Sequence, residues 1–251
     1  MVLNHVRRGR GEPLTLIHPL GADLFVWEPV LDRLAGERDV IALDLPGFGR
    51  SPPLNAAAPT PQALAAAVAS FLDGLGIERT HVAGISLGGW VALELAKAGR
   101  ALSVAGLCTA GLWGRPLGRR PGPDVRRLGR LLRPVLPALV RSERVRGLVL
   151  RAVVGHPERV PADAAARLVR AYLTATAFEG ANAAMRADVF SGVEQISVPV
   201  TLAWGELDRL VRRPRRGVPG GWRSTVLRGC GHLPTWDDPD QVAGVLLAAS
   251  P

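Results

Sequence analysis

Ser86 is the residue whose surroundings most clearly suit it for chemistry, because Gly84 and Gly88 flank it in a Gly-x-Ser-x-Gly pattern. A short apolar run precedes this pattern, and a helix-like segment at residues 90–98 follows it. A serine on a tight strand-to-helix turn projects its hydroxyl away from the backbone, and such a turn needs small neighbours. The following helix N-terminus favours negative charge that develops there. The pattern predicts a nucleophile, although a glycine-rich turn whose serine has no catalytic role would have the same sequence.

A serine nucleophile needs a base, and the base needs a carboxylate that orients it. Two later predicted strands, at residues 198–204 and 225–227, are each followed within a few positions by a titratable residue, Asp208 and His232 respectively. The carboxyl ends of parallel strands gather at one edge of a sheet. The order serine, acid, histidine also suits a nucleophile on such a turn. We therefore predict Asp208 as the acid and His232 as the base.

Other assignments of the acid and the base remain open at this point. Glu206 lies two residues before Asp208 and could replace it, and Asp208 could be only a helix N-cap. His232 could be an ordinary loop histidine, but it is the histidine that combines the required chain order with a glycine-rich turn. The remaining histidines are His5, His18, His81 and His156.

Backbone N–H groups that bind an oxyanion are the third component of such a site. One donor is expected directly after the nucleophile, at Leu87, and the other in the loop that follows an early strand. Residues 14–17 form that predicted strand, and residues 18–21 form the loop. Pro19 has no N–H group to donate. The predicted pair of donors is therefore Leu20 and Leu87, unless the loop is only a connection.

Taken together, these motifs resemble those of the α/β-hydrolase superfamily along nearly the whole chain. The matching stretches, in the expected order, are the His-Pro-Leu-Gly loop at 18–21, Trp27, the Asp-x-x-Gly-x-Gly-x-Ser loop at 44–51, the turn at 84–88, the Trp-Gly-x-x-Asp stretch at 204–208 and the Gly-His pair at 231–232. The resemblance implies a mostly parallel α/β sheet flanked by helices, a Ser-His-Asp triad, and hydrolysis of an ester, a thioester or a related bond.

Two features depart from the usual superfamily pattern. Pro19 stands where a glycine is usual, which stiffens the loop. The segment before the strand at residues 14–17 is too short for the family's first hairpin strand, so we expect about seven strands. Residues 18–23 are similar to the enol-lactonase branch of the superfamily.

Regular strand and helix alternation is interrupted between residues 112 and 190. Apolar residues there are spaced among arginines in a pattern that predicts helices at 125–132, 138–154 and 162–178. We therefore predict an α/β-hydrolase core formed by residues 1–111 and 191–251, with a helical lid at residues 112–190. A lid covers the nucleophile and excludes water from it.

The positive charge of the chain is concentrated in this predicted lid. The chain has 31 Lys+Arg and 22 Asp+Glu, a net charge of +9. Residues 112–190 contain 15 arginines and 6 acidic residues, whereas the remainder contains 16 basic and 16 acidic residues. No nucleic-acid-binding motif accompanies the charge, so we expect no nucleic-acid partner.

The composition also limits location and cofactors. No run approaches the roughly 18 apolar residues of a membrane span, no secretory leader is recognised, and Cys108 and Cys230 do not form a disulfide framework. We expect a cytoplasmic protein with no membrane partner, no metal and no organic cofactor, acting on a small-molecule substrate.

The sequence therefore predicts a serine hydrolase that cleaves a small ester, lactone or thioester through an acyl-enzyme intermediate. The same triad also serves a cofactor-free perhydrolase (haloperoxidase) and a carbon–carbon bond hydrolase. A protein of another class, which binds a ligand without turnover, would keep the fold as well.

The arginines of the predicted lid give a test by ionic strength. If they attract substrate, kcat/KM for an anionic ester will exceed that for a matched neutral ester at low salt. Screening over about 8–10 Å at physiological ionic strength will then reduce the advantage. Because the arginines are scattered, we expect the ratio of the two kcat/KM values to stay unchanged. A ratio that falls as salt rises would show that the lid recruits anionic substrates.

Overall fold

A seven-stranded sheet forms the centre of the protein, in the strand order β1-β3-β2-β4-β5-β6-β7. A computed structural model describes the chain except residues 56, 119–124, 215–216, 220 and 251. Only β1 is antiparallel to its neighbour, which confirms the mostly parallel sheet expected from the sequence. The strands are β1 (His5–Arg8), β2 (Pro13–Ile17), β3 (Asp39–Leu43), β4 (Thr80–Ile85), β5 (Ala101–Leu107), β6 (Val200–Gly205) and β7 (Arg223–Leu227).

The apolar runs of the sequence become the central strands. Every residue of β3 and β4 is buried, because helices cover both faces of a parallel sheet. The strands at the two edges, β1 and β7, are largely exposed or half-buried. The antiparallel edge strand β1 is short, completes the seven strands expected from the sequence, and pairs Val6 with Ala42.

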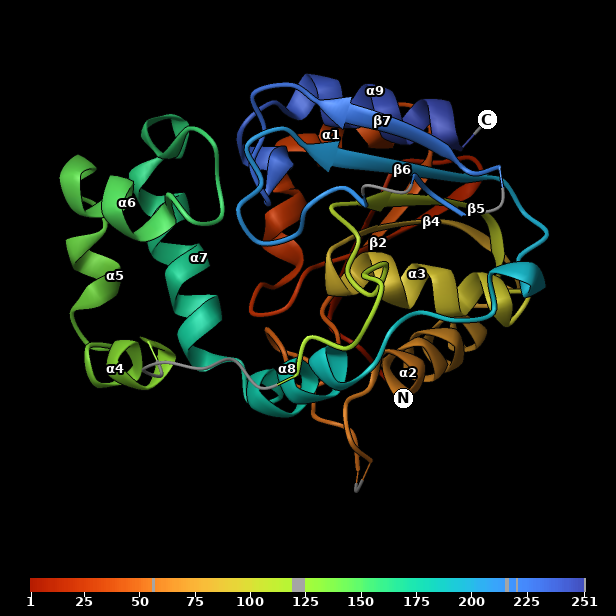
Figure 1. Cartoon of the computed structure of the whole chain (residues 1–251), viewed down its shortest axis with the longest axis horizontal. Coiled ribbons are helices and arrows are strands. Elements are labelled where there is room, and N and C mark those ends of the chain that lie inside the picture. The colour runs from red at the N-terminus through yellow and green to blue at the C-terminus, as the bar shows by residue number, and fades with distance from the viewer. Residues whose placement is uncertain (56, 119–124, 215–216, 220, 251) are drawn as a thin grey trace.

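Two pairs of helices cover the sheet, one pair on each face (Figure 1). Helices α1 (Glu28–Ala35) and α9 (Pro239–Ala249) pack on one face, and α2 (Pro61–Gly74) and α3 (Leu87–Lys97) pack on the other. Alternate residues of β3 serve the two cores: Val40 and Ala42 face the first pair, and Ile41 and Leu43 face the second.

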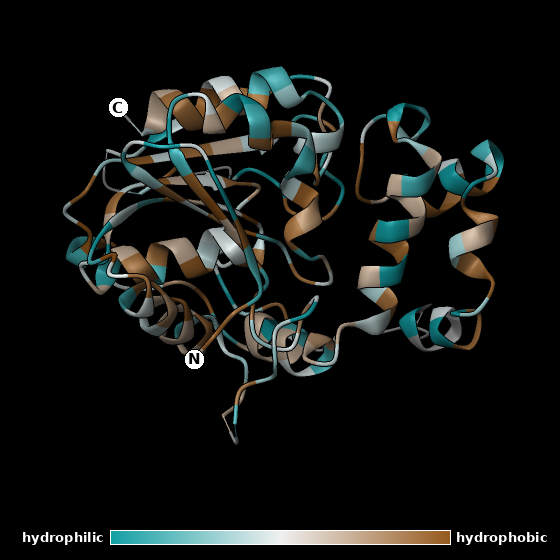
Figure 2. Cartoon of the chain, turned by 180° about the vertical axis from the view of Figure 1, so that it is seen from behind, coloured by the Kyte–Doolittle hydropathy of each residue, from teal (hydrophilic) through white to brown (hydrophobic). Residues whose placement is uncertain are grey.

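Between β5 and β6, the described residues form five α-helices. They are α4 (Val125–Leu131), α5 (Leu136–Leu139), α6 (Glu143–Leu150), α7 (Ala162–Thr174) and α8 (Phe178–Ala187). Figure 1 shows α4 to α7 beside the edge of the sheet toward which β6 and β7 point. Figure 2 shows hydrophilic and hydrophobic residues alternating along these helices. No helix in the described part of the chain is both long enough and apolar enough to cross a membrane.

Two helix predictions in this inserted segment were wrong in extent. Instead of one helix over 138–154, α5 and α6 are separated at Ser142, whose backbone is extended. The helix predicted over 162–178 ends at Thr174, because the N–H groups of Thr176 and Ala177 both donate to the Gly47 carbonyl oxygen rather than continuing the helix. The end of α7 at Thr174 is therefore determined by a contact with the loop after β3.

Part of the basic charge in the inserted segment is structural. The buried guanidinium of Arg126 donates to Glu179 at 2.6 Å and to the carbonyl oxygens of Ala175 and Tyr172, at 2.6 and 3.1 Å. Its carbon lies 4.3 Å from the centre of the Phe178 ring. Arg126 therefore joins α4 to the junction of α7 and α8, where the interrupted helix leaves backbone carbonyls to be satisfied.

Candidate active site

Ser86 occupies a strained turn between β4 and α3. Its φ is 55° and its ψ is −113°, which is unusual for any residue with a side chain. The turn is held because the Ser86 N–H donates to the Leu107 carbonyl oxygen at 2.8 Å, while the Ser86 carbonyl oxygen accepts from Ala110 at 3.0 Å and from Trp90 at 3.2 Å. The helix begins directly after the serine, three positions earlier than the sequence indicated, so its N-terminus lies next to the hydroxyl-bearing residue.

The two flanking glycines are required by backbone contacts. A Cβ atom on Gly84 would overlap the Gly88 carbonyl oxygen, and a Cβ atom on Gly88 would overlap the carbonyl oxygens of Ile17 and His18. These contacts bring the turn against the end of β2 and the start of the 18–21 loop. The Gly-x-Ser-x-Gly pattern therefore records the close approach of three backbone segments.

His232 and Asp208 form a buried pair. The Nδ1 atom of His232 lies 2.8 Å from Oδ2 of Asp208, and the two side chains are 6% and 1% exposed. The other carboxylate oxygen of Asp208 accepts N–H groups from Leu210 at 2.7 Å and Val211 at 3.0 Å. Burial would raise the pKa of the Asp208 carboxyl, but the hydrogen bond with His232, the charge of that ring and the two backbone N–H groups hold this pKa below its ordinary value. Asp208 is therefore an ionised partner for the imidazole.

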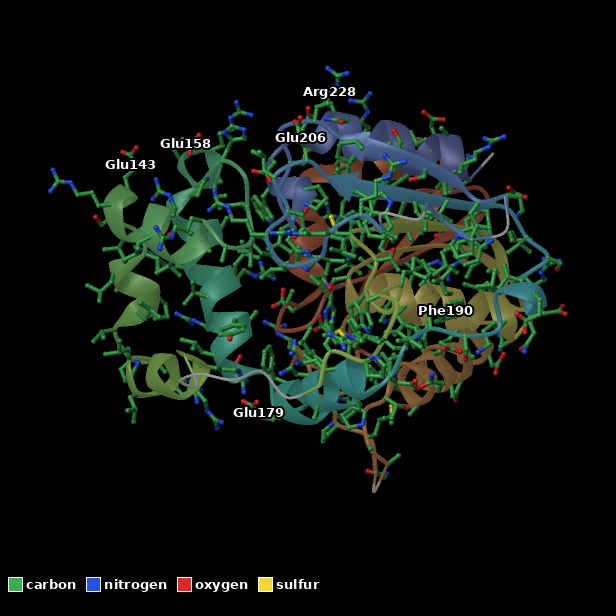
Figure 3. All side chains as sticks on the ribbon, viewed as in Figure 1. Glu143, Glu158, Glu179, Phe190, Glu206 and Arg228 are labelled. Carbon is green, nitrogen blue, oxygen red and sulfur yellow. The ribbon has the colours of Figure 1, made fainter. Side chains whose placement is uncertain are left out.

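Glu206, the alternative acid, lies elsewhere. Its carboxylate accepts the Gly229 N–H at 2.8 Å, and its side chain is exposed at the surface of the molecule (Figure 3). The structure thus brings Asp208, and not Glu206, against His232. The Trp-Gly-x-x-Asp spacing at residues 204–208 favours Asp208 over Glu206 in the sequence, and the observed contact is with Asp208.

A buried thiol lies beside the acid and the histidine. The Cys108 sulfur, a carboxylate oxygen of Asp208 and a ring nitrogen of His232 all lie within 4.8 Å of one another. Burial, together with the charge of Asp208, raises the pKa of the Cys108 thiol well above its usual value. A metal ion would need the thiolate, so this cluster is better suited to an acid–histidine pair packed on a neutral thiol. Cys108 and Cys230 are both free and buried.

The predicted oxyanion donors lie in segments that contact each other. Neither the Leu20 N–H nor the Leu87 N–H has an acceptor within the described part of the chain. The 18–21 loop is fixed by the buried His18, whose Nε2 accepts the Leu45 N–H at 2.9 Å and whose Nδ1 lies 2.8 Å from the Pro19 carbonyl oxygen. Burial lowers the pKa of the His18 imidazole, so this ring is neutral and donates from Nδ1.

One contact of the histidine turn was not foreseen. The carboxylate of Asp237 accepts the Gly231 N–H, directly before His232, at 2.7 Å. In the sequence, Asp237 is the first member of an Asp-Asp-Pro run, a pattern typical of a helix start. The second aspartate, Asp238, is the residue that caps α9, since its side chain accepts the Gln241 N–H at 2.9 Å. A helix start needs one capping aspartate, so the other aspartate of the run, Asp237, is the sequence signal for an additional acceptor of backbone N–H groups.

The arrangement of motifs agrees with a comparison to known families. A model of the alpha/beta hydrolase family matches residues 16–245. The chain belongs to the alpha/beta hydrolase family. This family assignment covers the strained serine turn, both loops of the acid–histidine pair and the inserted helices.

Individual known proteins are similar to this chain in part of the sequence or in the fold. Epoxide hydrolase EphH of Mycobacterium tuberculosis is 30% identical over 192 residues, which are 70% of this chain and 87% of that protein. The dihydrolipoyllysine-residue acetyltransferase component of the acetoin cleaving system of Cupriavidus necator is 46% identical over 106 residues; these are 41% of this chain but only 28% of that protein. The enol-lactonase from Burkholderia xenovorans LB400 superimposes with a TM-score of 0.76 at 23% identity, covering 99% of this chain and 96% of that one, and shares the fold.

The geometry predicts different outcomes for the two acidic residues after β6. Asp208→Asn removes the negative charge beside His232 and allows the amide NH₂ group to face Nδ1, which favours the wrong imidazole tautomer, so kcat for an ester should fall by about 10⁴-fold. Glu206→Gln should have little effect, since an amide oxygen can still accept the Gly229 N–H. Steady-state kinetics on one ester compare the two variants. A larger loss in Glu206→Gln would show that the acid has been assigned wrongly.

Proposed function

We propose that this protein is a serine hydrolase that cleaves a small ester, lactone or thioester through an acyl-enzyme intermediate. The observation that carries the proposal is the buried pair of His232 and Asp208 on the same sheet edge as the strained Ser86 turn. In this proposal Ser86 is the nucleophile, His232 the general base, and Asp208 the group that fixes the imidazole tautomer. The fold shared with an enol-lactonase is compatible with such a substrate.

The proposed reaction has two steps, acylation of Ser86 and hydrolysis of the acyl-serine. Because Asp208 holds the Nδ1–H of His232, the Nε2 atom is left as the base. The Ser86 hydroxyl loses its proton to Nε2 as its oxygen bonds to the substrate carbonyl carbon. The N–H groups of Leu20 and Leu87 bind the resulting oxyanion. The leaving group departs with the proton from Nε2, and water then cleaves the acyl-serine ester by the same route, releasing the acid.

The inserted segment, residues 112–190, is proposed to act as the lid of this site, with residues 1–111 and 191–251 as the core. Support comes from the contact between α7–α8 and the 18–21 loop. A Cβ atom on Gly21 would lie 2.7 Å from the Tyr172 ring and 3.0 Å from the Phe178 ring. Two aromatic rings therefore lie directly against the loop that carries the proposed oxyanion donor Leu20, where they would exclude water.

The relative that is called an epoxide hydrolase suggests a second substrate class. The chemistry of Ser86 argues against it. Attack of a serine hydroxyl on an epoxide carbon would leave an ether on the protein, and water does not readily cleave an ether. Attack on a carbonyl carbon leaves an ester, which His232 can help water to cleave. Ester, lactone and thioester substrates therefore fit a serine at this turn better than epoxides.

Replacing the nucleophile tests the proposal directly. Ser86→Ala should reduce kcat for an ester by on the order of 10⁴–10⁶-fold while the protein remains folded. The matched control is Ser70→Ala, which changes an exposed serine on α2 and should leave kcat unchanged. Circular dichroism confirms folding of both variants. Substantial esterase activity in folded Ser86→Ala protein would remove Ser86 from the mechanism.

A further inference from the structure

The carboxylate of Asp237 connects two turns that are about 75 residues apart in the chain. It is 5% exposed and accepts three backbone N–H groups. Its Oδ2 atom accepts from Gly231 at 2.7 Å and from Gly155 at 2.9 Å, while Oδ1 accepts from His156 at 2.8 Å. Gly231 precedes the proposed base, His232, whereas residues 155–156 belong to the inserted segment. One buried anion therefore holds the histidine turn and the proposed lid together.

A second hydrogen bond joins the same two turns on the other side of His232. The Leu233 N–H donates to the Val153 carbonyl oxygen at 2.7 Å. The residues on both sides of His232 are thus joined to residues 153–156, Leu233 directly and Gly231 through Asp237. These two contacts therefore help to hold the backbone that carries the ring facing Asp208, beside the contact of the Cys108 thiol with the Gly231 carbonyl oxygen.

The two turns pack backbone against backbone at glycines. A Cβ atom on Gly231 would lie 2.6 Å from the Gly155 nitrogen, and one on Gly155 would lie 2.6 Å from the Gly229 carbonyl oxygen. No side chain could enter this crossing without moving one turn. The N–H groups of Gly155, His156 and Gly231 converge there, and a carboxylate is the group that can accept all three.

In the described part of the chain, no basic side chain forms an ion pair with the Asp237 carboxylate. Arg159 donates to its backbone carbonyl oxygen at 3.5 Å and not to its carboxylate. Burial, followed by the charge of Asp237, raises the pKa of the nearby Cys230 thiol to about 12, which keeps that thiol neutral. The neighbouring Asp238 supplies the cap of α9, so Asp237 is not needed to begin that helix.

We propose that Asp237 is a positioning residue that holds His232 in register with Asp208 and couples the histidine turn to residues 153–156 of the inserted segment. The catalytic half of this inference rests on the proposed function, because it takes His232 as the base. The coupling half does not, since it concerns only the three N–H groups. An amide at position 237 would accept through a single oxygen and turn its NH₂ group toward an N–H donor.

Hydrogen exchange measured by mass spectrometry tests the coupling without any substrate. In Asp237→Asn, peptides covering residues 153–156 and 229–233 should lose protection together, while peptides from β3 and β4 keep theirs. In Asp237→Glu, which keeps the anion, both peptides should retain more protection than in the amide variant. The control is Asp238→Asn, the same change one residue along, where loss should be confined to the start of α9. Unchanged protection in Asp237→Asn, or a loss in one turn alone, would overturn the coupling.

Kinetics test the catalytic half. Asp237→Asn should lower kcat by roughly 10–100-fold with a much smaller change in KM, as expected when a catalytic group is displaced slightly. Asp238→Asn should keep kcat. In a His232→Ala background, Asp237→Asn should cause no further loss in the rate of Ser86 labelling by a fluorophosphonate, because its effect passes through the histidine. An equal loss with and without His232 would show a general structural role. Absence of any Ser86-dependent activity in the unmodified protein would instead refute the proposed function, and the exchange result would still decide the coupling.

Discussion

The close crossing of backbones at Ser86 is the constraint on which the rest of the structure depends. Ser86 has a positive φ because α3 begins directly after β4. Gly84 packs against the Gly88 carbonyl group, and Gly88 packs against the end of β2, so neither position has room for a side chain. Such strain persists only where the surroundings over-determine it. Here the conformation of Ser86 is fixed by three backbone hydrogen bonds and by the fully buried strand β4 that precedes it. The serine is thereby fixed at the sheet edge where the other strands also end.

Irregular backbone at that edge is fixed by buried polar side chains rather than by further secondary structure. The neutral His18 ring fastens the 18–21 loop, and the carboxylate of Asp44 accepts the N–H groups of Leu24 and Arg50. Asp237 does the same for the histidine turn. Each side chain satisfies backbone N–H groups that have no strand or helix partner, as buried polar groups require. Rigid loops at a sheet edge give precise positions to the groups that would act on a substrate.

How far the sequence predicts this architecture varies with the kind of residue. Gly84 and Gly88 reveal the turn, because a close backbone approach admits only glycine and so leaves a visible pattern. The spacing from Trp204 favours Asp208 over Glu206, but only the folded turn after β6 shows which of the two carboxylates contacts His232. The role of Asp237 is easily missed because an Asp-Asp-Pro run indicates a helix cap, and Asp238 alone supplies that cap. The break after Thr174 is equally invisible, because the Gly47 carbonyl oxygen that causes it lies 127 positions earlier in the chain.

A covalent acyl intermediate on Ser86 can be trapped and located. An aryl carbamate that acylates serine and is released slowly would be incubated with the protein, and intact-mass and peptide mass spectrometry would locate the adduct. We expect one carbamoyl group for each chain, on the peptide that contains Ser86, with ester hydrolysis lost in proportion. Loss of activity with the adduct on another residue, or continued hydrolysis while Ser86 is fully modified, would contradict the assignment of Ser86 as the nucleophile.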